Sequence, residues 1–386
     1  MNHRASILPA LVGLASLAVC AQPAQTVAAL TPAEIGIQKA QEQIARQPDY
    51  VPYYASLAMA YARRARETSD FNYYAKAEET LDRSRKLDPD NFEALKVRTL
   101  LLLARNEFAK ALEAAAALHK RVPDDITVYG YLVDANVELG NYDDAVEAAQ
   151  WMLNLRPGNI AGLTHAAYLR ELHGNLPGAV DLLHTAYDST PFQESEDRAW
   201  LLTRMANLQL LSGNLPEAEK YATNALGLFP DYHYALGMLA DVRLTQNRND
   251  EAVALLEKRY AAAPHGENLF ALAQALERAG RKDAAAKAFA EFEQKALRES
   301  SMARNANHEL IAYYVDYAHQ PAKALAIATE ELTRRHDPFT LDAYAWSLAA
   351  CGDYARANLE MQKAVAFGIK DPKILGHASE IARHLQ

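Results

Sequence analysis

Cysteine is scarce in this chain of 386 residues, which contains only Cys20 and Cys351. Two cysteines cannot form the framework of several disulfides that stabilises many small secreted domains, so a disulfide-based fold is excluded. Free cysteines in proteins more often pack as small apolar residues than react. We therefore expect Cys351 to be an inert packing residue.

The sequence also lacks the short motifs of common catalytic sites. It contains no His-Glu-x-x-His, no Gly-x-Ser-x-Gly, no Gly-x-x-x-x-Gly-Lys and no Cys-x-x-Cys. These motifs place metal ligands, nucleophiles or phosphate-binding amides in the geometry that their chemistry needs. His308-Glu309 begins the first motif, but no second histidine follows one turn later. We therefore expect a protein that is not an enzyme, with no metal site and no cofactor.

Basic residues are outnumbered, and the formal net charge is −9. Nucleic acids and anionic membrane surfaces favour basic patches, so we expect neither as a partner. A protein or peptide partner that is basic or neutral remains compatible with this charge.

No apolar run near the N-terminus is long enough to cross a membrane. Ile7 to Val19 is an apolar run of thirteen residues that contains Pro9 and Gly13, whereas a spanning helix needs about 20 residues. Arg4 precedes this run and small residues follow it. The pattern is typical of a secretory signal peptide over residues 1–25, so we expect an exported protein, periplasmic or extracellular, whose mature chain has no transmembrane span.

The end of the predicted signal peptide can be interpreted in two further ways. Cleavage after Ala21 is our first expectation, but Leu17-Ala18-Val19-Cys20 also resembles a bacterial lipoprotein box. In that alternative Cys20 is acylated and anchors the protein, although Val19 is bulkier than the glycine or alanine usual at its position. The remaining interpretation is a buried first helix.

A pattern that recurs at a fixed spacing fills the rest of the chain. Three columns of residues follow steps of 34, interrupted by one step of 39. Prolines that end each unit stand at Pro89, Pro123, Pro157, Pro191, Pro230 and Pro264. Alanines small enough to let two helices approach closely stand at Ala111, Ala145, Ala179, Ala218 and Ala252. Residues that tolerate a left-handed turn stand at Asn106, Gly140, Gly174, Gly213 and Asn247.

The unit from Ile126 to Asn159 shows what is repeated. Apolar residues three and four apart predict an amphipathic helix that ends at Gly140. A second amphipathic helix follows and ends before Pro157, whose ring does not fit inside a helix. Each unit is therefore predicted to be a helix–turn–helix.

A 34-residue helix–turn–helix with a small residue at the crossing and a closing proline resembles the tetratricopeptide repeat family. The resemblance covers roughly Thr31 to the C-terminus and implies an all-α fold, a right-handed α-solenoid. Leucine replaces the aromatic of Tyr129 in neighbouring units, for example at Leu95, which is conservative for packing. The family implies a scaffold or adaptor for protein–protein interaction, but its motifs do not identify the partner.

The repeats suggest how the chain is organised. We expect a solenoid over residues 31–299, with a half repeat plus about six to seven repeats, and over residues 300–386 a degenerate repeat, a final repeat and a C-terminal capping helix. The polar stretch 299–307 is the best candidate for a hinge. Seven extra residues around Arg63 to Tyr74 and five near Glu194 to Arg198 interrupt the period. Such insertions either form loops on a binding face or are tolerated on the surface.

In this family the first helices of successive units line a concave groove. Applying the same steps to those helices gives the candidate ligand-binding residues Asp134, Tyr168, Trp200, Thr203, Asn207, Tyr234 and Asp241. Aromatic rings beside carboxylates and amides could hold an extended peptide by stacking and by hydrogen bonds to its backbone. The plainer interpretation is that the polar residues are solvated and the aromatics pack between units. Two other functions stay open: an enzyme-associated or carbohydrate-modifying accessory protein with its site within 299–336, and a self-assembling structural protein.

The predicted processing can be checked on the protein isolated from its source cells. We expect the mass of the N-terminal peptide to match a chain beginning at Gln22, because small residues precede that bond. A diacylglycerol-modified Cys20 would support the lipoprotein alternative, and an intact Met1 would contradict both.

Overall fold

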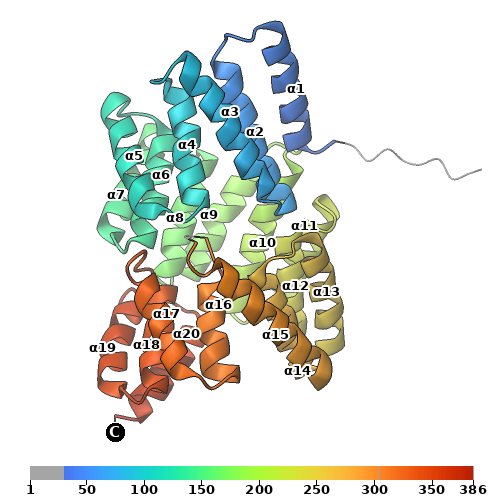
Figure 1. The fold of residues 1–386 in the computed structure, drawn as a ribbon, viewed down its shortest axis with the longest axis vertical. Helices are drawn as coiled ribbons and strands as arrows, with labels where there is room; N and C mark the ends of the chain where they lie inside the picture. Colours follow the sequence, from blue (N-terminus) through green and yellow to red (C-terminus); the bar gives the residue numbers. More distant parts are fainter. Residues whose placement is uncertain (1–29, 303, 386) are drawn as a thin grey trace, which may run out of the picture.

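The computed structural model describes residues 30–302 and 304–385. Within these residues every regular element is helical, with twenty α-helices and one π-helical turn, η1 (Figure 1). The predicted all-α solenoid is therefore confirmed. The expected signal peptide, residues 1–25, and the candidate lipidation site Cys20 lie outside the described residues.

The described helices form nine antiparallel pairs. The first helices of the pairs are α2 (Pro52–Thr68), α4 (Phe92–Ala104), α6 (Ile126–Glu138), α8 (Ile160–Leu172), α10 (Ser195–Leu211), α12 (His233–Thr245), α14 (Gly266–Arg278), α16 (Asn307–Ala312) with η1 (Tyr313–Tyr317), and α18 (Pro338–Ala350). The second helices are α3 (Asn72–Leu87), α5 (Phe108–Arg121), α7 (Tyr142–Leu155), α9 (Leu176–Ser189), α11 (Leu215–Leu228), α13 (Asn249–Ala262), α15 (Lys282–Glu299), α17 (Pro321–Glu331) and α19 (Tyr354–Val365). Two single helices flank the pairs, α1 (Pro32–Arg46) and α20 (Pro372–Arg383).

The turn and crossing columns of the sequence act as expected. All five turn residues have a positive φ, between 59° at Asn106 and 80° at Gly140. In the turn between α6 and α7, the Asn141 amide donates to the Asn136 carbonyl at 2.8 Å, which closes the end of α6. The five alanines of the crossing column are completely buried. A methyl group is therefore the largest side chain that fits where the two helices of a pair meet.

The first helices α4, α6 and α8 each begin shortly after a proline, and a polar side chain caps each of them there. Asn91, Asp125 and Asn159 each stand two residues after a proline, and each accepts a hydrogen bond from the backbone amide three residues on. This satisfies an amide that has no partner within the helix. At α1, Thr31 and Glu34 form a capping box.

Two turns of the superhelix pack against each other. His265 Nε2 donates to the Ser69 carbonyl at 2.6 Å across 196 residues, and Arg304 Nη1 donates to the Ala104 carbonyl at 3.1 Å across 200 residues. The His336 amide donates to the Glu138 carbonyl at 2.7 Å, also across roughly 200 residues of sequence. One superhelical turn thus takes about six units of 34 residues. Figure 1 accordingly shows α17–α20 against α5–α8.

The two insertions lengthen helices instead of forming loops. Both α2 and α10 have 17 residues, whereas α4, α6, α8 and α12 each have 13. The lengthened ends meet and form an ion-pair cluster that we call the clasp, comprising Arg63, Arg66, Glu194, Glu196 and Asp197. The two departures from the 34-residue period therefore contact each other.

The centre of the clasp is a buried carboxylate. Glu196 is completely buried, and both of its oxygens lie 3.1 Å from Arg66 Nε. Tyr232 Oη donates to the same carboxylate at 2.7 Å. A buried charge is costly unless charged and hydrogen-bonding partners surround it, as they do here.

The C-terminal units depart from the regular pattern. Between α15 and α16, Asn307 Nδ2 donates both to the Ser300 carbonyl at 3.0 Å and to the buried Glu331 carboxylate at 2.7 Å. The hinge proposed for 299–307 stays a prediction. Cys351 is exposed at the end of α18, so the expected packing role is wrong. Among the described residues, no helix has the length and apolar character to span a bilayer.

The clasp can be tested by removing one partner at a time. Arg66→Met should lower the free energy of unfolding by about 2–4 kcal/mol, because it leaves Glu196 buried and charged without its cation. Adding Glu196→Gln should restore much of the loss. Arg83→Met, at an exposed ion pair on α3, is the control and should cost at most about 0.5 kcal/mol. Urea unfolding followed by circular dichroism measures all four proteins, and a double variant no more stable than Arg66→Met would contradict the clasp.

Candidate functional site

The structure brings all seven predicted ligand-binding residues to one cavity of about 710 Å³, which we call the groove. They come from the inner sides of four successive first helices, α6, α8, α10 and α12. The predicted residues in the groove wall are Asp134, Tyr168, Trp200, Thr203, Asn207, Tyr234 and Asp241. Charged residues that the sequence analysis did not select also line it: Arg66, Glu138, His165, Glu171, Arg204 and Arg259.

Two glycines make room for side chains in the groove wall. A Cβ atom on Gly130 would lie 3.2 Å from the His165 ring, and one on Gly237 would lie 2.8 Å from the Arg259 guanidinium. Because these helices carry no side chain at those positions, the imidazole and the guanidinium pack directly against their backbones. The glycines therefore set the positions of a histidine and an arginine that face the groove.

His165 and Asp134 form a charged pair across α6 and α8. His165 Nδ1 lies 2.6 Å from the Ala161 carbonyl oxygen, which only accepts, so this nitrogen carries a proton. Its Nε2 lies 3.0 Å from Asp134 Oδ1 and donates to that carboxylate. Burial favours the neutral ring, but Asp134 and the Ala161 carbonyl outweigh it and raise the pKa of His165. The negative charge of Asp134 is thus largely balanced by the protonated His165.

Glu171, Arg204 and Asn207 form a second polar group, between α8 and α10. Arg204 pairs with Glu171, and Asn207 Nδ2 donates to Glu171 Oε1 at 3.1 Å. The Thr203 hydroxyl donates to the Ala199 carbonyl at 2.8 Å and is buried. Asn207 and Thr203 are therefore partly engaged within the protein, which leaves fewer of their groups for a ligand.

The three aromatic residues come from three successive units. Tyr168 and Trp200 are half-buried, whereas Tyr234 is 40% exposed. The Arg204 guanidinium lies 5.8 Å from the centre of the Tyr168 ring, within the range of a cation–π contact. Tyr234 packs beside His233, with ring centres 3.9 Å apart. Each of these three units thus contributes to the groove one aromatic ring with an accessible surface.

Two carboxylates in the groove, those of Glu138 and Asp241, have no bonded partner among the described residues. Burial raises the pKa of Glu138 to about 8; Asp337 and Asp134 add to the increase, and Arg335 opposes it. Asp241 is open to the groove, but the walls around it remove hydration and raise its pKa to about 6, against the opposing charges of Arg259 and Arg278.

Sequence reasoning could have found some of the missed groove residues. Glu138 follows Asp134 by one helical turn, and Arg204 lies between Trp200 and Asn207 on the same helix. Extending each column by one turn would have included both. Arg66 gave no such signal, because it reaches the groove from α2 through the clasp.

A second cavity of about 230 Å³ lies between α16, α18 and α20, partly within the 299–336 region considered for an enzymatic site. His308 Nε2 lies 2.9 Å from the Thr340 hydroxyl oxygen, and that hydroxyl donates its proton to Asp337 Oδ2 at 2.6 Å. His308 must therefore donate to Thr340 and cannot remove its proton. Burial lowers the pKa of His308 to about 4 and keeps the ring neutral.

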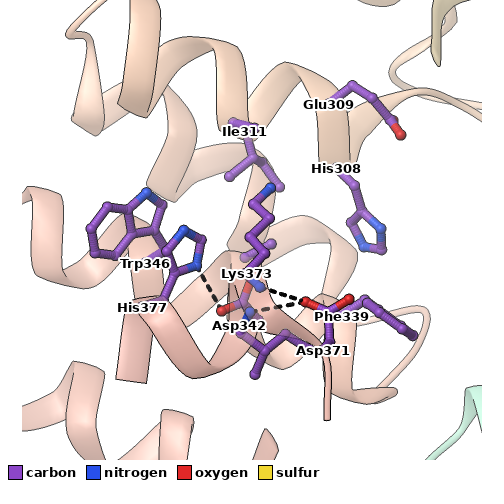
Figure 2. A pocket seen from close by; sticks show the side chains of 12 residues that line it. His308, Glu309, Ile311, Phe339, Asp342, Trp346, Asp371, Lys373 and His377 are labelled. Atoms are coloured by element: carbon purple, nitrogen blue, oxygen red, sulfur yellow. Dashed lines mark hydrogen bonds and ion pairs between the residues drawn. The ribbon is translucent and has the colours of Figure 1, made fainter. Parts of the chain in front are cut away.

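The opposite wall of this second cavity carries a histidine–aspartate pair. Figure 2 shows His377 stacked on Trp346, with Lys373 extending into the cavity towards Ile311. The two rings are 4.1 Å apart, and His377 Nδ1 lies 2.8 Å from Asp342 Oδ1. No serine, threonine or cysteine among the described residues bonds to His377, and no group of three or more histidine, cysteine or acidic side chains there could hold a metal. The arrangement orients a histidine but supplies no nucleophile.

The fold and the groove define an α-solenoid whose inner wall is formed by the first helices of successive pairs. Models of the tetratricopeptide repeat match residues 62–126, 210–265 and 238–301. The chain therefore contains tetratricopeptide repeats. Such repeats generally serve as non-catalytic scaffolds for protein interaction, which supports that class of function here.

Solved structures confirm the fold and no more. The crystal structure of the APC/C hetero-tetramer Cut9-Hcn1 is 12% identical with a TM-score of 0.53, over 89% of this chain and 58% of that chain. The human IFIT1 dimer with m7Gppp-AAAA is 12% identical with a TM-score of 0.51, over 86% of this chain and 84% of that chain. Comparison with curated proteins finds no match.

The raised pKa of Glu138 predicts how the stability of the fold changes with pH. Between about pH 4.5 and pH 8 the folded state holds a proton that the unfolded state has lost, so Glu138 destabilises the fold progressively as pH rises through this range. Glu138→Gln should therefore raise the free energy of unfolding by about 1–3 kcal/mol at pH 8.5 and have little effect at pH 4.5.

Thermal unfolding at both pH values measures this difference. Glu147→Gln, at an exposed site on α7, is the matched control and should show no such dependence. An equal effect of Glu138→Gln at both pH values would mean that Glu138 titrates normally.

Proposed function

We propose that this chain is a non-catalytic adaptor that holds an extended segment of a partner protein in the groove. The observation that carries the proposal is the convergence of all seven repeat-derived residues on one cavity. Three of them are aromatic and come from three successive units, Tyr168, Trp200 and Tyr234. Rings repeated along a groove suit a ligand that is itself a polymer with regularly placed side chains.

The backbone of such a segment would be held by side chains, because the helices of the groove wall use their own backbone groups internally. Asp241 and Asp134 offer carboxylate oxygens to peptide amides, and the unpartnered Nε of Arg259 offers a donor to peptide carbonyls. Mixed aromatic and polar walls of this kind fit a peptide better than a purely apolar ligand.

We also propose that the adaptor works outside the cytoplasm, in the bacterial envelope or beyond it. This part rests on the apolar run and small residues within residues 1–25. The N-terminal mass described above tests it separately from the groove.

The groove is tested by comparing three full-length proteins as bait in an extract of the source cells. The groove variant carries Asp134→Ala, Tyr168→Ala and Asp241→Ala. The control variant carries Asp144→Ala, Trp151→Ala and Asp181→Ala, which remove two acids and one aromatic from exposed positions on second helices. Thermal unfolding first confirms that both variants fold.

We expect a partner that wild type and the control retain and that the groove variant loses. A fragment of that partner should bind the groove variant at least about tenfold more weakly, the effect of losing interactions worth ~1.4 kcal/mol. A partner that all three proteins retain would contradict groove binding. If no partner is found and sedimentation shows oligomers that grow with concentration, the self-assembling alternative replaces the adaptor.

A further inference from the structure

We propose that the groove recognises a basic partner segment by placing a lysine or arginine side chain between the Glu138 carboxylate and the Tyr168 ring. This inference rests on the proposed function and adds the chemical class of the segment. It follows from which charges in the groove are already balanced within the protein and which are not.

Most charged side chains of the groove already have partners. Arg204 pairs with Glu171, and Asp134 accepts from the protonated His165. The Arg66 guanidinium pairs with Glu196 and Asp197 in the clasp. None of these groups offers a free charge to a ligand.

The end of the groove at α12 has no excess of negative charge. Asp241 has no bonded partner, but Arg259 and Arg278 both act on its carboxylate. Arg259 lies flat against Gly237 and faces the same space. A ligand charge of either sign would therefore meet an opposing and a like charge at this end.

The end at α6 has an excess of negative charge. The Glu138 carboxylate forms no hydrogen bond or ion pair within the described residues, and the charged groups acting on it are Asp337, Asp134 and Arg335. Arg335 is itself held by Glu331 at 3.4 Å. A ligand cation at Glu138 would supply the positive charge that the protein does not provide.

The surroundings of Glu138 suit a long basic side chain. Burial, together with the nearby carboxylates of Glu138 and Asp337, raises the pKa of the Tyr168 and Tyr142 phenols, so both rings stay neutral. Tyr168 lines the groove and is half-buried, which leaves part of its ring for the methylene stem of lysine or arginine. The stem would pack on the ring while its charged end reaches the carboxylate.

This arrangement couples binding to proton release. Near pH 7 the Glu138 carboxyl holds a proton in the free protein, and a bound cation favours the ionised form. Binding should therefore release close to one proton at pH 7, and affinity should rise between pH 6.5 and 8.5. A groove that holds a neutral or acidic segment at this position would show neither effect.

The test uses the full-length protein to select from a phage-displayed library of random twelve-residue peptides at pH 8. We expect selected peptides to be enriched in lysine and arginine. Calorimetry with a synthetic selected peptide should show about tenfold or more weaker binding to Glu138→Gln, and unchanged binding to the exposed control Glu147→Gln. The heat of binding at pH 7 in buffers of different ionisation enthalpy measures the proton released.

The possible outcomes separate this inference from the proposed function. Selected peptides that lose affinity with Trp200→Ala but not with Glu138→Gln, or that lack basic residues, would overturn the basic-segment inference and leave the groove adaptor standing. Selected peptides that no groove substitution weakens would overturn both. Enrichment of basic residues together with Glu138-dependent proton release would support the inference.

Discussion

The buried ion pair between Arg66 and Glu196 fixes how the solenoid winds. It joins α2 to α10 across 130 residues, and Tyr232 of the following unit holds the same carboxylate. This contact brings the N-terminal units around the inner wall and places Arg66 in the groove. The second turn then packs under the first through contacts such as His265 with Ser69. An array that is otherwise held together only by neighbouring units thus gains contacts between distant ones.

The parts of the fold that depend on neighbouring residues were predictable from the sequence. Turn residues such as Gly140 need a positive φ, and crossing residues such as Ala145 must be small; both requirements recur in every unit. The inner positions of the first helices follow from the same period, which is why the seven candidate residues meet in one cavity. Periodic sequence determines periodic structure because each unit packs on its neighbours in the same way.

The parts that depend on contacts between superhelical turns were not predictable. The two insertions gave no sign that they would pair with each other, because that requires knowing how tightly the solenoid winds. The exposure of Cys351 and the tautomer of His308 depend on the particular packing of α18. Likewise, the sequence could place Glu138 one turn beyond Asp134, but it could not show that Asp337 lies close enough to raise its pKa.

The groove is therefore a product of the whole superhelix and not of four repeats alone. The His336 amide holds the Glu138 carbonyl, and Arg335 and Asp337 on either side of His336 act on the Glu138 carboxylate. The charge that a ligand meets at this end of the groove is consequently set by a segment about 200 residues away, in the second turn. Coupling between two sites is reciprocal. A ligand whose binding changes the ionisation of Glu138 therefore also changes how strongly the two turns hold each other, which links occupancy of the groove to the packing of the C-terminal units.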